Sequence, residues 1–320
     1  MSQPADRILE GIRQKSRISI ARAISLVENE HADADRVLRS IYPGTGNAYR
    51  VGITGPPGAG KSTITNKLAK FYRTKKLAVG IIAVDPTSPF TGGALLGDRI
   101  RMTDVELDEG VFIRSMASRG SLGGLSRKAG EAADILDAAG YDVILLETVG
   151  VGQSELDIVR AADTTVVVLV PESGDSIQAM KAGLMEIGDF FVVNKADRPG
   201  AEQAVMSVKM ILNFRSTKND WAPDVIQTVA QEGKGIDTVA EMIARHRAYM
   251  EEHSLLVQKR RRRITDRVRE LIGEHLRNDF WTHEREQLLQ TRVRNIMQQQ
   301  TTPYDLAESL LRDFSPPIHQ

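Results

Sequence analysis

A glycine-rich segment of nine residues constrains the fold of this chain more than any other feature of its sequence. Its residues are Gly55, Pro56, Pro57, Gly58, Ala59, Gly60, Lys61, Ser62 and Thr63. The segment follows a β-branched run, Arg50–Thr54, and opens into Ser62–Thr74, where apolar residues recur at helical spacing. It matches the pattern G-x-x-x-x-G-K-S/T, in which the backbone wraps an anion and a helix N-terminus directs N–H groups at phosphate oxygens. The sequence therefore predicts a phosphate-binding strand–loop–helix unit; a glycine-rich turn without a ligand is the alternative.

The last three side chains of this segment suit a triphosphate. We expect the Lys61 ammonium to neutralise the β- and γ-phosphates, and the Ser62 hydroxyl to take one position on Mg²⁺. Thr63 is expected to contact the α-phosphate. The expected ligand is therefore a nucleoside triphosphate with magnesium.

Short apolar runs alternate with helical patterns through the middle of the chain. The runs are Arg50–Thr54, Val79–Val84, Val111–Met116, Asp142–Leu146, Thr164–Val170, Phe190–Val193 and Val225–Ala230. Most are continuous rather than alternating, as expected of strands that are buried on both faces of a parallel sheet. Helical patterns such as Ser62–Thr74 and Arg127–Ala139 lie between them. We therefore predict an α/β fold with a mostly parallel, doubly wound sheet.

Helical patterns on both sides of this alternation set the expected domain limits. Residues 1–45 are predicted to form an N-terminal helical extension, because the breaker cluster Pro43–Gly46 follows them. Residues 46–250 are predicted to form the nucleotide-binding domain, and residues 251–320 a C-terminal helical arm.

The arm carries apolar residues that need a covering surface. They include Ile264, Val268, Leu271 and Ile272. A second copy of the chain is the simplest cover, since two-fold dimers are the commonest assembly; packing back onto the same chain is the alternative. Thr302 and Pro303 are expected to cap and open the last helix.

A second motif, Asn194-Lys195-Ala196-Asp197, points to the base of the nucleotide. A carboxylate at Asp197 can accept two hydrogen bonds from guanine, whereas it would repel the lone pair at adenine N1. We expect Lys195 to lie along the base, and Asn194 to hold neighbouring loops and to reach the base edge; a helix cap after a strand is the alternative. Backbone N–H groups from a further short segment are expected to reach guanine O6. That segment is Val229, Ala230 and Gln231.

Three carboxylates follow predicted strands or lie in a nearby glycine-rich stretch. Asp85 and Glu147 end strands, and Asp98 lies between the second and third strands. The carboxyl ends of parallel strands face one crevice, so these residues are expected to hold Mg²⁺ or its water shell and to orient the attacking water. Loop capping is the alternative for Asp85 and Asp98. Gln153 is expected either to position the attacking water or to be a polar switch residue that faces solvent.

Composition excludes several other classes of protein. The 42 Lys and Arg residues balance 42 Asp and Glu residues, which argues against broad electrostatic binding to nucleic acid or to a membrane surface. The basic run Lys259–Arg263 lies among acidic residues and is expected to be a solvated or partner-facing surface. No apolar run approaches the about 20 residues of a membrane span. The 320 residues include no cysteine, which fits a reducing compartment, so we expect a cytoplasmic protein.

These motifs together resemble the MeaB/ArgK-type GTPases, which are associated with methylmalonyl-CoA mutase and related cobalamin-dependent acyl-CoA mutases. The likeness rests on GPPGAGKST, VDPTSP, GDRIRM, SMASRGSLGGLS, ETVGVGQSE, VVLVPESGDSIQAMKAG and NKAD. It covers nearly the whole chain. The resemblance implies a P-loop NTPase fold, GTP or GDP with Mg²⁺ as ligand, slow GTP hydrolysis that the mutase stimulates, and a homodimer formed through the C-terminal arm.

The resemblance also implies a chaperone role and the segments that perform it. GTP binding and hydrolysis would gate adenosylcobalamin loading, protect the mutase or help to release damaged cofactor. Switch regions would lie near Asp85–Asp98 and Glu147–Glu155, and Pro171–Lys181 would relay the nucleotide state to the mutase.

Two rival functions stay open on the sequence alone. One is a kinase linked to amino-acid transport, which would transfer the phosphoryl group to another molecule instead of water. The other is a nickel-type metallochaperone GTPase, against which the chain offers no cysteine and six histidines without paired ligand spacing.

Overall fold

The computed structural model describes residues 4–85, 105, 107–117, 124–148, 160–171, 184–213, 221–312 and 314. The chain divides into two compact units, Met1–Lys259 and Arg260–Gln320.

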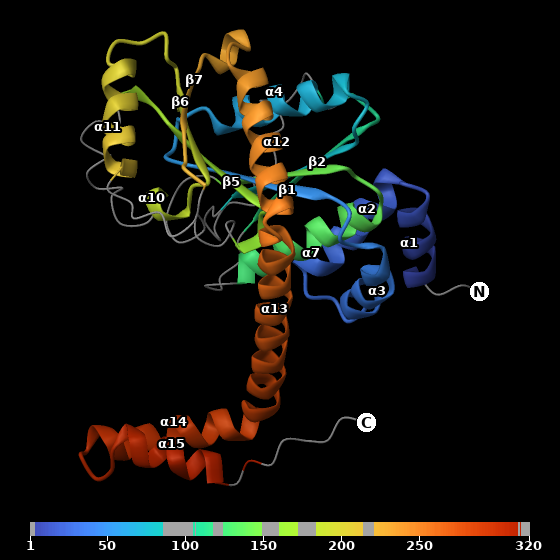
Figure 1. Cartoon of the computed structure of the whole chain (residues 1–320). Coiled ribbons are helices and arrows are strands. Elements are labelled where there is room, and N and C mark those ends of the chain that lie inside the picture. The colour runs from blue at the N-terminus through green and yellow to red at the C-terminus, as the bar shows by residue number, and fades with distance from the viewer. Residues whose placement is uncertain are drawn as a thin grey trace. The chain divides into compact units, whose positions relative to one another are not determined.

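A parallel sheet forms the centre of the first unit (Figure 1). Within the described residues it has seven strands in the order β3-β2-β4-β1-β5-β6-β7, and neighbouring strands pair in parallel. Their bounds are β1 Tyr49–Thr54, β2 Val79–Asp85, β3 Val111–Ala117, β4 Val143–Thr148, β5 Thr164–Leu169, β6 Phe190–Asn194 and β7 Val225–Thr228. The predicted doubly wound α/β fold is confirmed, and each predicted apolar run forms a strand.

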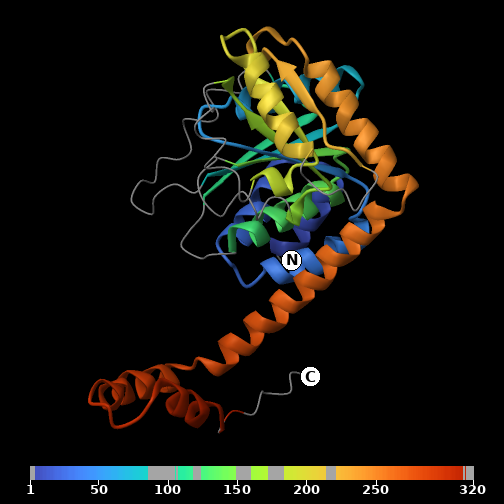
Figure 2. The same cartoon turned by 60° about the vertical axis from the view of Figure 1, so that its left-hand side comes forward.

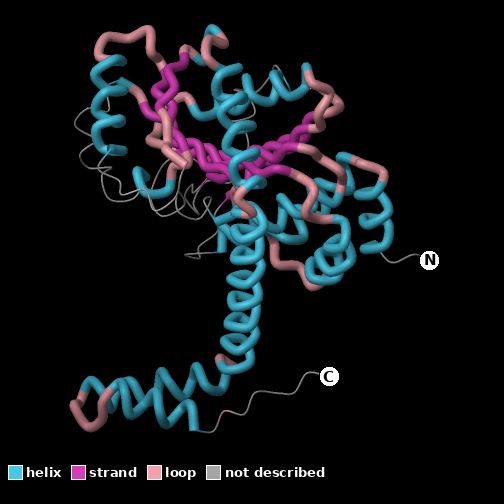
Figure 3. The backbone as a smooth tube through the Cα atoms, in the orientation of Figure 1, coloured by secondary structure: helices cyan, strands magenta, loops and turns pink. Residues whose placement is uncertain are grey.

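Helices cover both faces of this sheet, as Figure 3 shows for the first unit. On one face, α4 (Lys61–Thr74) and α12 (Ile236–Glu252) pack against alternate residues of the strands, such as Ile53 and Val168. On the other face, α7 (Gly124–Ala138) packs against residues of β2 and β4, and α10 (Leu184–Ile187) and α11 (Ala201–Asn213) pack against β5 and β6. Burial on both faces explains why the strands are continuous apolar runs.

The N-terminal extension consists of α1 (Pro4–Arg13), α2 (Arg17–Glu28) and α3 (Ala34–Ile41), followed by the 3₁₀ turn Tyr42–Gly44. Its buried residues recur at three- and four-residue steps and pack with α7 in one apolar cluster. The extension is therefore a further layer on the α7 face of the sheet.

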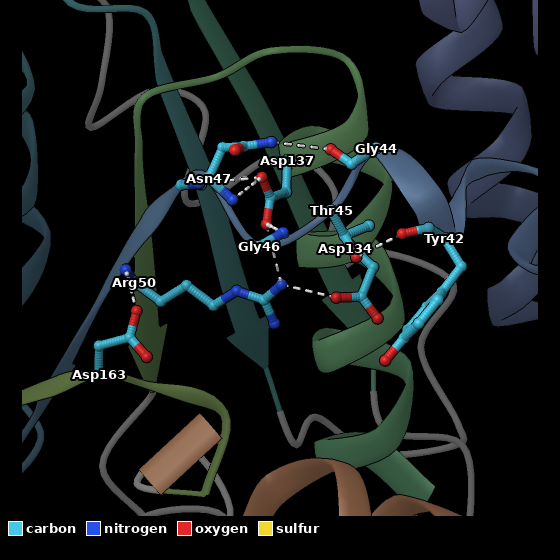
Figure 4. A network of polar contacts seen from close by, with 10 residues as sticks. Tyr42, Gly44, Thr45, Gly46, Asn47, Arg50, Asp134, Asp137 and Asp163 are labelled. Carbon is cyan, nitrogen blue, oxygen red and sulfur yellow. Dashed lines mark hydrogen bonds and ion pairs between the residues drawn. The ribbon is translucent and has the colours of Figure 1, made fainter. Parts of the chain in front are cut away.

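A buried polar network fixes the chain where the extension leads into β1 (Figure 4). The Asp137 carboxylate in α7 accepts hydrogen bonds from the N–H groups of Gly46, Asn47 and Ala48 at 2.8, 3.1 and 2.9 Å. The Arg50 guanidinium in β1 contacts Asp137 at 3.5 Å and Asp134, also in α7, at 2.6 Å. These contacts join α7 to the first residues of the strand that precedes the glycine-rich segment.

The last strand is shorter than predicted. The sequence predicts a strand over Val225–Ala230, but β7 ends at Thr228 and a 3₁₀ turn occupies Ala230–Glu232. The Ala230 N–H donates to Asn194 Oδ1 at 3.1 Å instead of continuing a strand ladder. Side-chain capture of this N–H ends the strand, and apolar character alone does not reveal it.

The second unit begins within the long helix α13 (Leu255–Phe280) and continues with α14 (His283–Met297) and α15 (Pro303–Arg312), the red helices of Figure 2. The Phe280 ring packs edge-on against Phe314, and the Arg285 guanidinium lies over both rings. The predicted start of the last helix is confirmed: Thr302 precedes α15, and its hydroxyl accepts a hydrogen bond from the Asp305 N–H. None of the described helices combines the length and apolar character needed to cross a bilayer.

Candidate functional site

The glycine-rich segment lies between β1 and α4, at the carboxyl edge of the sheet. Two of its glycines are required by their surroundings. Gly55 has φ +136°, and a Cβ there would lie 2.0 Å from Val168 O. Gly60 has φ +89°, and a Cβ there would lie 2.3 Å from the Asn194 side-chain nitrogen. Because an L side chain rarely adopts these dihedrals and has no room here, the loop conformation depends on glycine at both positions.

Lys61, the first residue of α4, folds back over the glycine-rich segment. Its side chain is buried, and Nζ donates to Gly55 O at 2.7 Å and to Pro56 O at 2.9 Å. Among the described residues, no side chain caps the α4 N-terminus after Gly60. A buried ammonium beside an uncapped helix N-terminus makes an electropositive site, suited to a phosphate.

Ser62 and Glu147 meet at this edge from different elements. The Ser62 hydroxyl in α4 donates to Glu147 Oε1 at 2.5 Å, and Glu147 is buried near the end of β4. The parallel register places Glu147 beside Ile53 of β1 and beside Ala83 of β2. A hydroxyl and a carboxylate oxygen are the hard donors that Mg²⁺ prefers, so this pair fits a magnesium site.

Three further residues that the sequence singles out are described only in part or not at all. Asp85 is the last residue of β2, on the same edge of the sheet as Glu147, but its side chain lies outside the described residues. Asp98 and Gln153 lie wholly outside them. So do the greater parts of the three predicted switch segments, of which the structure describes Asp85, Glu147–Thr148 and Pro171.

Asn194 connects three segments of this site. Its side-chain Nδ2 donates to Ala59 O of the glycine-rich segment at 2.9 Å. Its Oδ1 accepts from the Ala230 N–H at 3.1 Å and from the Thr228 hydroxyl at 3.0 Å. The Asn194 side chain thus brings together, across the ends of β6 and β7, the two segments that the sequence assigns to phosphate and to base. Sequence reasoning missed Thr228, although a threonine that ends a strand beside this motif is a usable signal.

The rest of the second motif forms a tight turn after β6. Lys195 has φ +58°, and the Ala196 N–H donates to Thr228 O at 3.0 Å. Asp197 is exposed. A hydrogen bond to the Glu232 carboxylate, together with the negative charges of Glu232 and Asp197, raises the pKa of the Lys234 ammonium. The turns after β6 and β7 thus carry exposed carboxylates at Asp197 and Glu232.

The structure narrows which N–H groups of Val229, Ala230 and Gln231 can face a base. The Val229 N–H donates to Lys234 O at 3.2 Å, and the Ala230 N–H is bound by Asn194. Gln231 is exposed and follows both. Two of the three N–H groups that the sequence assigns to the base are therefore bound within the protein.

Comparison with known proteins gives the family. Residues 20–285 match the family model described as methylmalonyl Co-A mutase-associated GTPase MeaB. This chain belongs to the MeaB family. A GTPase of Pyrococcus abyssi is 48% identical to it over 312 residues, which cover 97% of this chain and 96% of that protein. The GTPase ArgK of Escherichia coli is 37% identical over 281 residues, which cover 85% of each chain.

A solved structure shares the fold of this chain over 98% of its residues. The crystal structure of a LAO/AO transport system kinase superposes with a TM-score of 0.75 at 28% identity, and the match covers 98% of both chains. The fold is thus that of a P-loop NTPase, and the MeaB-family chain is a GTPase. Its family is linked by name to methylmalonyl-CoA mutase.

Proposed function

We propose that this MeaB-family GTPase is a magnesium-dependent regulatory chaperone of a cobalamin-dependent acyl-CoA mutase of the methylmalonyl-CoA mutase type. GTP binding and hydrolysis would gate adenosylcobalamin loading, protection or reactivation of the mutase. The observation that carries the nucleotide part is the Asn194 side chain, which bonds to both Ala59 O and the Ala230 N–H. One amide thereby couples the phosphate side and the base side of a single ligand. The family name supports the mutase as partner.

The chemistry that we propose is electrostatic positioning. Lys61 and the N–H groups of the glycine-rich segment hold the β- and γ-phosphates and stabilise negative charge that develops on the transferring group. Ser62 and Glu147 would hold Mg²⁺, together with Asp85 and Asp98 or through the ion's water shell. When bound, the ion neutralises phosphate charge. The same carboxylates orient the attacking water, and no covalent nucleophile is needed.

Exchange of Asp197 for asparagine tests recognition of guanine. In the Asp197→Asn variant, an amide N–H donor replaces one of the carboxylate oxygens that accept hydrogen bonds from guanine. We therefore expect its affinity for GTP to fall and its affinity for xanthosine triphosphate to rise, because xanthine carries a 2-oxo group that accepts a hydrogen bond. We expect GTP affinity to fall at least about tenfold, as for an unpaired polar group in a binding site. Calorimetric titration of both nucleotides with magnesium measures the change.

Asp35→Asn is the matched control, since Asp35 is an exposed aspartate of α3. It should bind GTP as the unchanged chain does. Equal GTP affinity in the Asp197→Asn variant and the unchanged chain would refute the assignment of Asp197 to the base.

The partner is tested with purified methylmalonyl-CoA mutase. We expect the mutase to raise the rate of GTP hydrolysis, because a regulatory GTPase responds to the protein that it serves. The rate is measured as phosphate release with and without the mutase. An unchanged rate, together with no co-elution of the GTP-loaded chain and the mutase, would remove this partner from the proposal.

We also propose that a second copy of the chain covers the exposed apolar face of α13. Ile264, Val268 and Ile272 follow one another at four-residue steps and are 50%, 50% and 54% exposed. Such a face is typical of a helix that packs on another helix. The Val268→Asp, Ile272→Asp double variant should sediment as a monomer where the unchanged chain is a dimer. Met210→Asp, on an exposed position of α11, is the control.

The name of the similar crystal structure supports phosphoryl transfer as a second candidate function. An experiment with GTP labelled at the γ-phosphate distinguishes GTP hydrolysis from transfer of the phosphoryl group to another molecule. Label released as inorganic phosphate supports hydrolysis, and label recovered on a small molecule or protein supports the kinase.

A further inference from the structure

Two threonines at the ends of β1 and β4 form a hydrogen bond that the nucleotide chemistry above does not use. Thr54 is the last residue of β1, and Gly55 of the glycine-rich segment follows it. Thr148 is the last residue of β4 and follows Glu147 directly. Both are fully buried, and the Thr148 hydroxyl donates to Thr54 Oγ1 at 3.0 Å.

The register of the two strands places this bond on the face of the sheet opposite to Ser62. Ile53 pairs with Glu147, and both point to the face that α4 covers, where Glu147 accepts the Ser62 hydrogen bond. Successive residues of a strand point to opposite faces, so Thr54 and Thr148 point to the α7 face. The end of β4 is thus tied on one face to α4 through Glu147, and on the other to β1 through Thr148.

Stability alone does not explain two hydroxyls at these positions. A buried hydroxyl must keep a partner, and two apolar side chains of the same shape can replace a bonded pair at little cost. Valine has nearly the shape of threonine and is common in this sheet, for example at Val166 and Val167 of β5. What the hydrogen bond adds is a fixed distance between two strand ends.

We infer that Thr54 and Thr148 are a positioning pair for GTP hydrolysis. Their hydrogen bond fixes the position of the Glu147 backbone relative to the start of the glycine-rich segment. The Glu147 carboxylate therefore stays within reach of the Ser62 hydroxyl and of the Mg²⁺ ion that Ser62 and Glu147 would hold. The inference rests on the proposed role of Ser62 and Glu147 in holding Mg²⁺.

The Thr148→Val variant tests this inference in the full-length chain. Because a small displacement of a catalytic group is costly, we expect kcat for GTP to fall about tenfold or more, while the affinity for GDP without magnesium changes by less than about threefold. The magnesium concentration that gives half-maximal hydrolysis should rise. Thr148→Ser keeps the hydroxyl and should restore most of kcat.

The double variant Thr54→Val, Thr148→Val separates positioning from packing. It leaves no orphaned hydroxyl, so its unfolding midpoint in urea should return toward that of the unchanged chain, whereas its kcat should stay low. Recovery of kcat in the double variant would overturn the inference, because the single variant would then have failed through an unpaired hydroxyl only.

Thr165→Val in β5 is the matched control for the substitution itself. Thr165 is also fully buried, and among the described residues its hydroxyl has no hydrogen-bond partner. This variant should hydrolyse GTP at the unchanged rate. If it slows hydrolysis as much as Thr148→Val does, loss of any buried hydroxyl from the sheet is sufficient, and the specific pair is refuted.

Glu147→Gln distinguishes failure of this inference from failure of the proposed function. If Glu147→Gln slows hydrolysis and Thr148→Val does not, the threonine pair has no positioning role and the magnesium site stands. If neither variant slows hydrolysis, the proposed role of Glu147 fails, and the positioning role fails with it.

Discussion

At the scale of single residues, Gly60 has two separate reasons to be glycine. Its φ of +89° lies in the left-handed region, and the space where a Cβ would stand is taken by the Asn194 side-chain nitrogen at 2.3 Å. The first reason concerns the conformation of the glycine-rich segment. The second concerns the Asn194 amide, which ties this segment to Ala230 after β7, so a side chain at Gly60 disturbs both at once.

Gly60→Ala should therefore weaken nucleotide binding as well as stability. Backbone strain of this kind costs about 1–3 kcal/mol, and displacement of the Asn194 amide adds the loss of its bond to Ala59 O. We expect GTP affinity to fall at least about tenfold, which corresponds to about 1.4 kcal/mol. Calorimetric titration with GTP and unfolding in urea measure the two effects.

Gly130→Ala in α7 is the contrasting variant, since a Cβ at Gly130 meets nothing within 4 Å. Alanine in a helix interior is favoured over glycine by about 0.5–1 kcal/mol, so this variant should be more stable and bind GTP normally. Normal GTP affinity in both variants would show that the Gly60–Asn194 approach does not matter for the site.

At the scale of elements, one carboxylate joins α7 to the entry of β1. Asp137 accepts three backbone N–H groups from residues 46–48 and contacts Arg50, and its side chain is fully buried (Figure 4). Asp134 contacts the same guanidinium but is 31% exposed. The two aspartates lie one turn apart on one helix and differ mainly in burial and in the backbone groups that they satisfy.

Asp137→Ala should thus destabilise the chain far more than Asp134→Ala. Loss of one partner from a buried ion pair costs about 3–5 kcal/mol, and here three N–H groups lose their acceptor as well. Arg50 is 7% exposed but keeps Asp137 as a partner when Asp134 is lost, and Asp134 itself is 31% exposed, so Asp134→Ala should cost only about 1 kcal/mol. Unfolding in urea measures the free energy of unfolding of both variants. Equal losses of stability would mean that the N–H groups of residues 46–48 find other acceptors when Asp137 is removed.

At the scale of the whole molecule, a buried histidine links stability to pH. His246 of α12 is 2% exposed, and its Nδ1 lies 2.7 Å from the Thr164 hydroxyl of β5. Its Nε2 lies 3.6 Å from Asp189, which also contacts Lys259 at 3.7 Å. Burial lowers the pKa of His246; the Asp189 carboxylate opposes this shift, and the Lys259 ammonium adds to it.

Stability should accordingly fall as the pH drops below about 6.5, the pKa of an unfolded histidine. Below that pH the unfolded chain binds a proton at His246 more readily than the folded chain does, so protonation favours unfolding. Above that pH His246 is neutral in both states, and its contribution to stability is fully present. Urea unfolding between pH 8 and pH 5.5 measures the slope.

His246→Gln should reduce the slope in this range, because the variant has no group there to protonate. His253→Gln is the control, since His253 is an exposed histidine directly after α12. An unchanged slope in His246→Gln would assign the pH dependence to other groups.

Most of the fold was predictable because its signals are local. A strand buried on both faces is mostly apolar, so the runs Asp142–Leu146 and Phe190–Val193 are recognisable from the sequence, and they match β4 and β6 to within two residues. The glycine-rich segment is recognisable from the sequence in the same way, since its backbone conformation depends on its own glycines. The end of β7 was placed two residues too late, because the group that stops it, Asn194, lies 36 residues from Ala230 in the chain.

The sequence by itself determined the succession of strands and helices along the chain and the glycine-rich strand–loop–helix unit, because each depends on neighbours in the chain; the motif for the base stays a prediction made on the same local grounds. Only the tertiary structure decided which groups meet: the Asn194 amide with the Ala59 carbonyl, 135 residues apart, and the Thr148 hydroxyl with Thr54 Oγ1, 94 residues apart. The residue type of a hydroxyl or amide side chain does not reveal which group it will bond to. The register of parallel strands selects that partner, and register is set by the packing of the whole sheet.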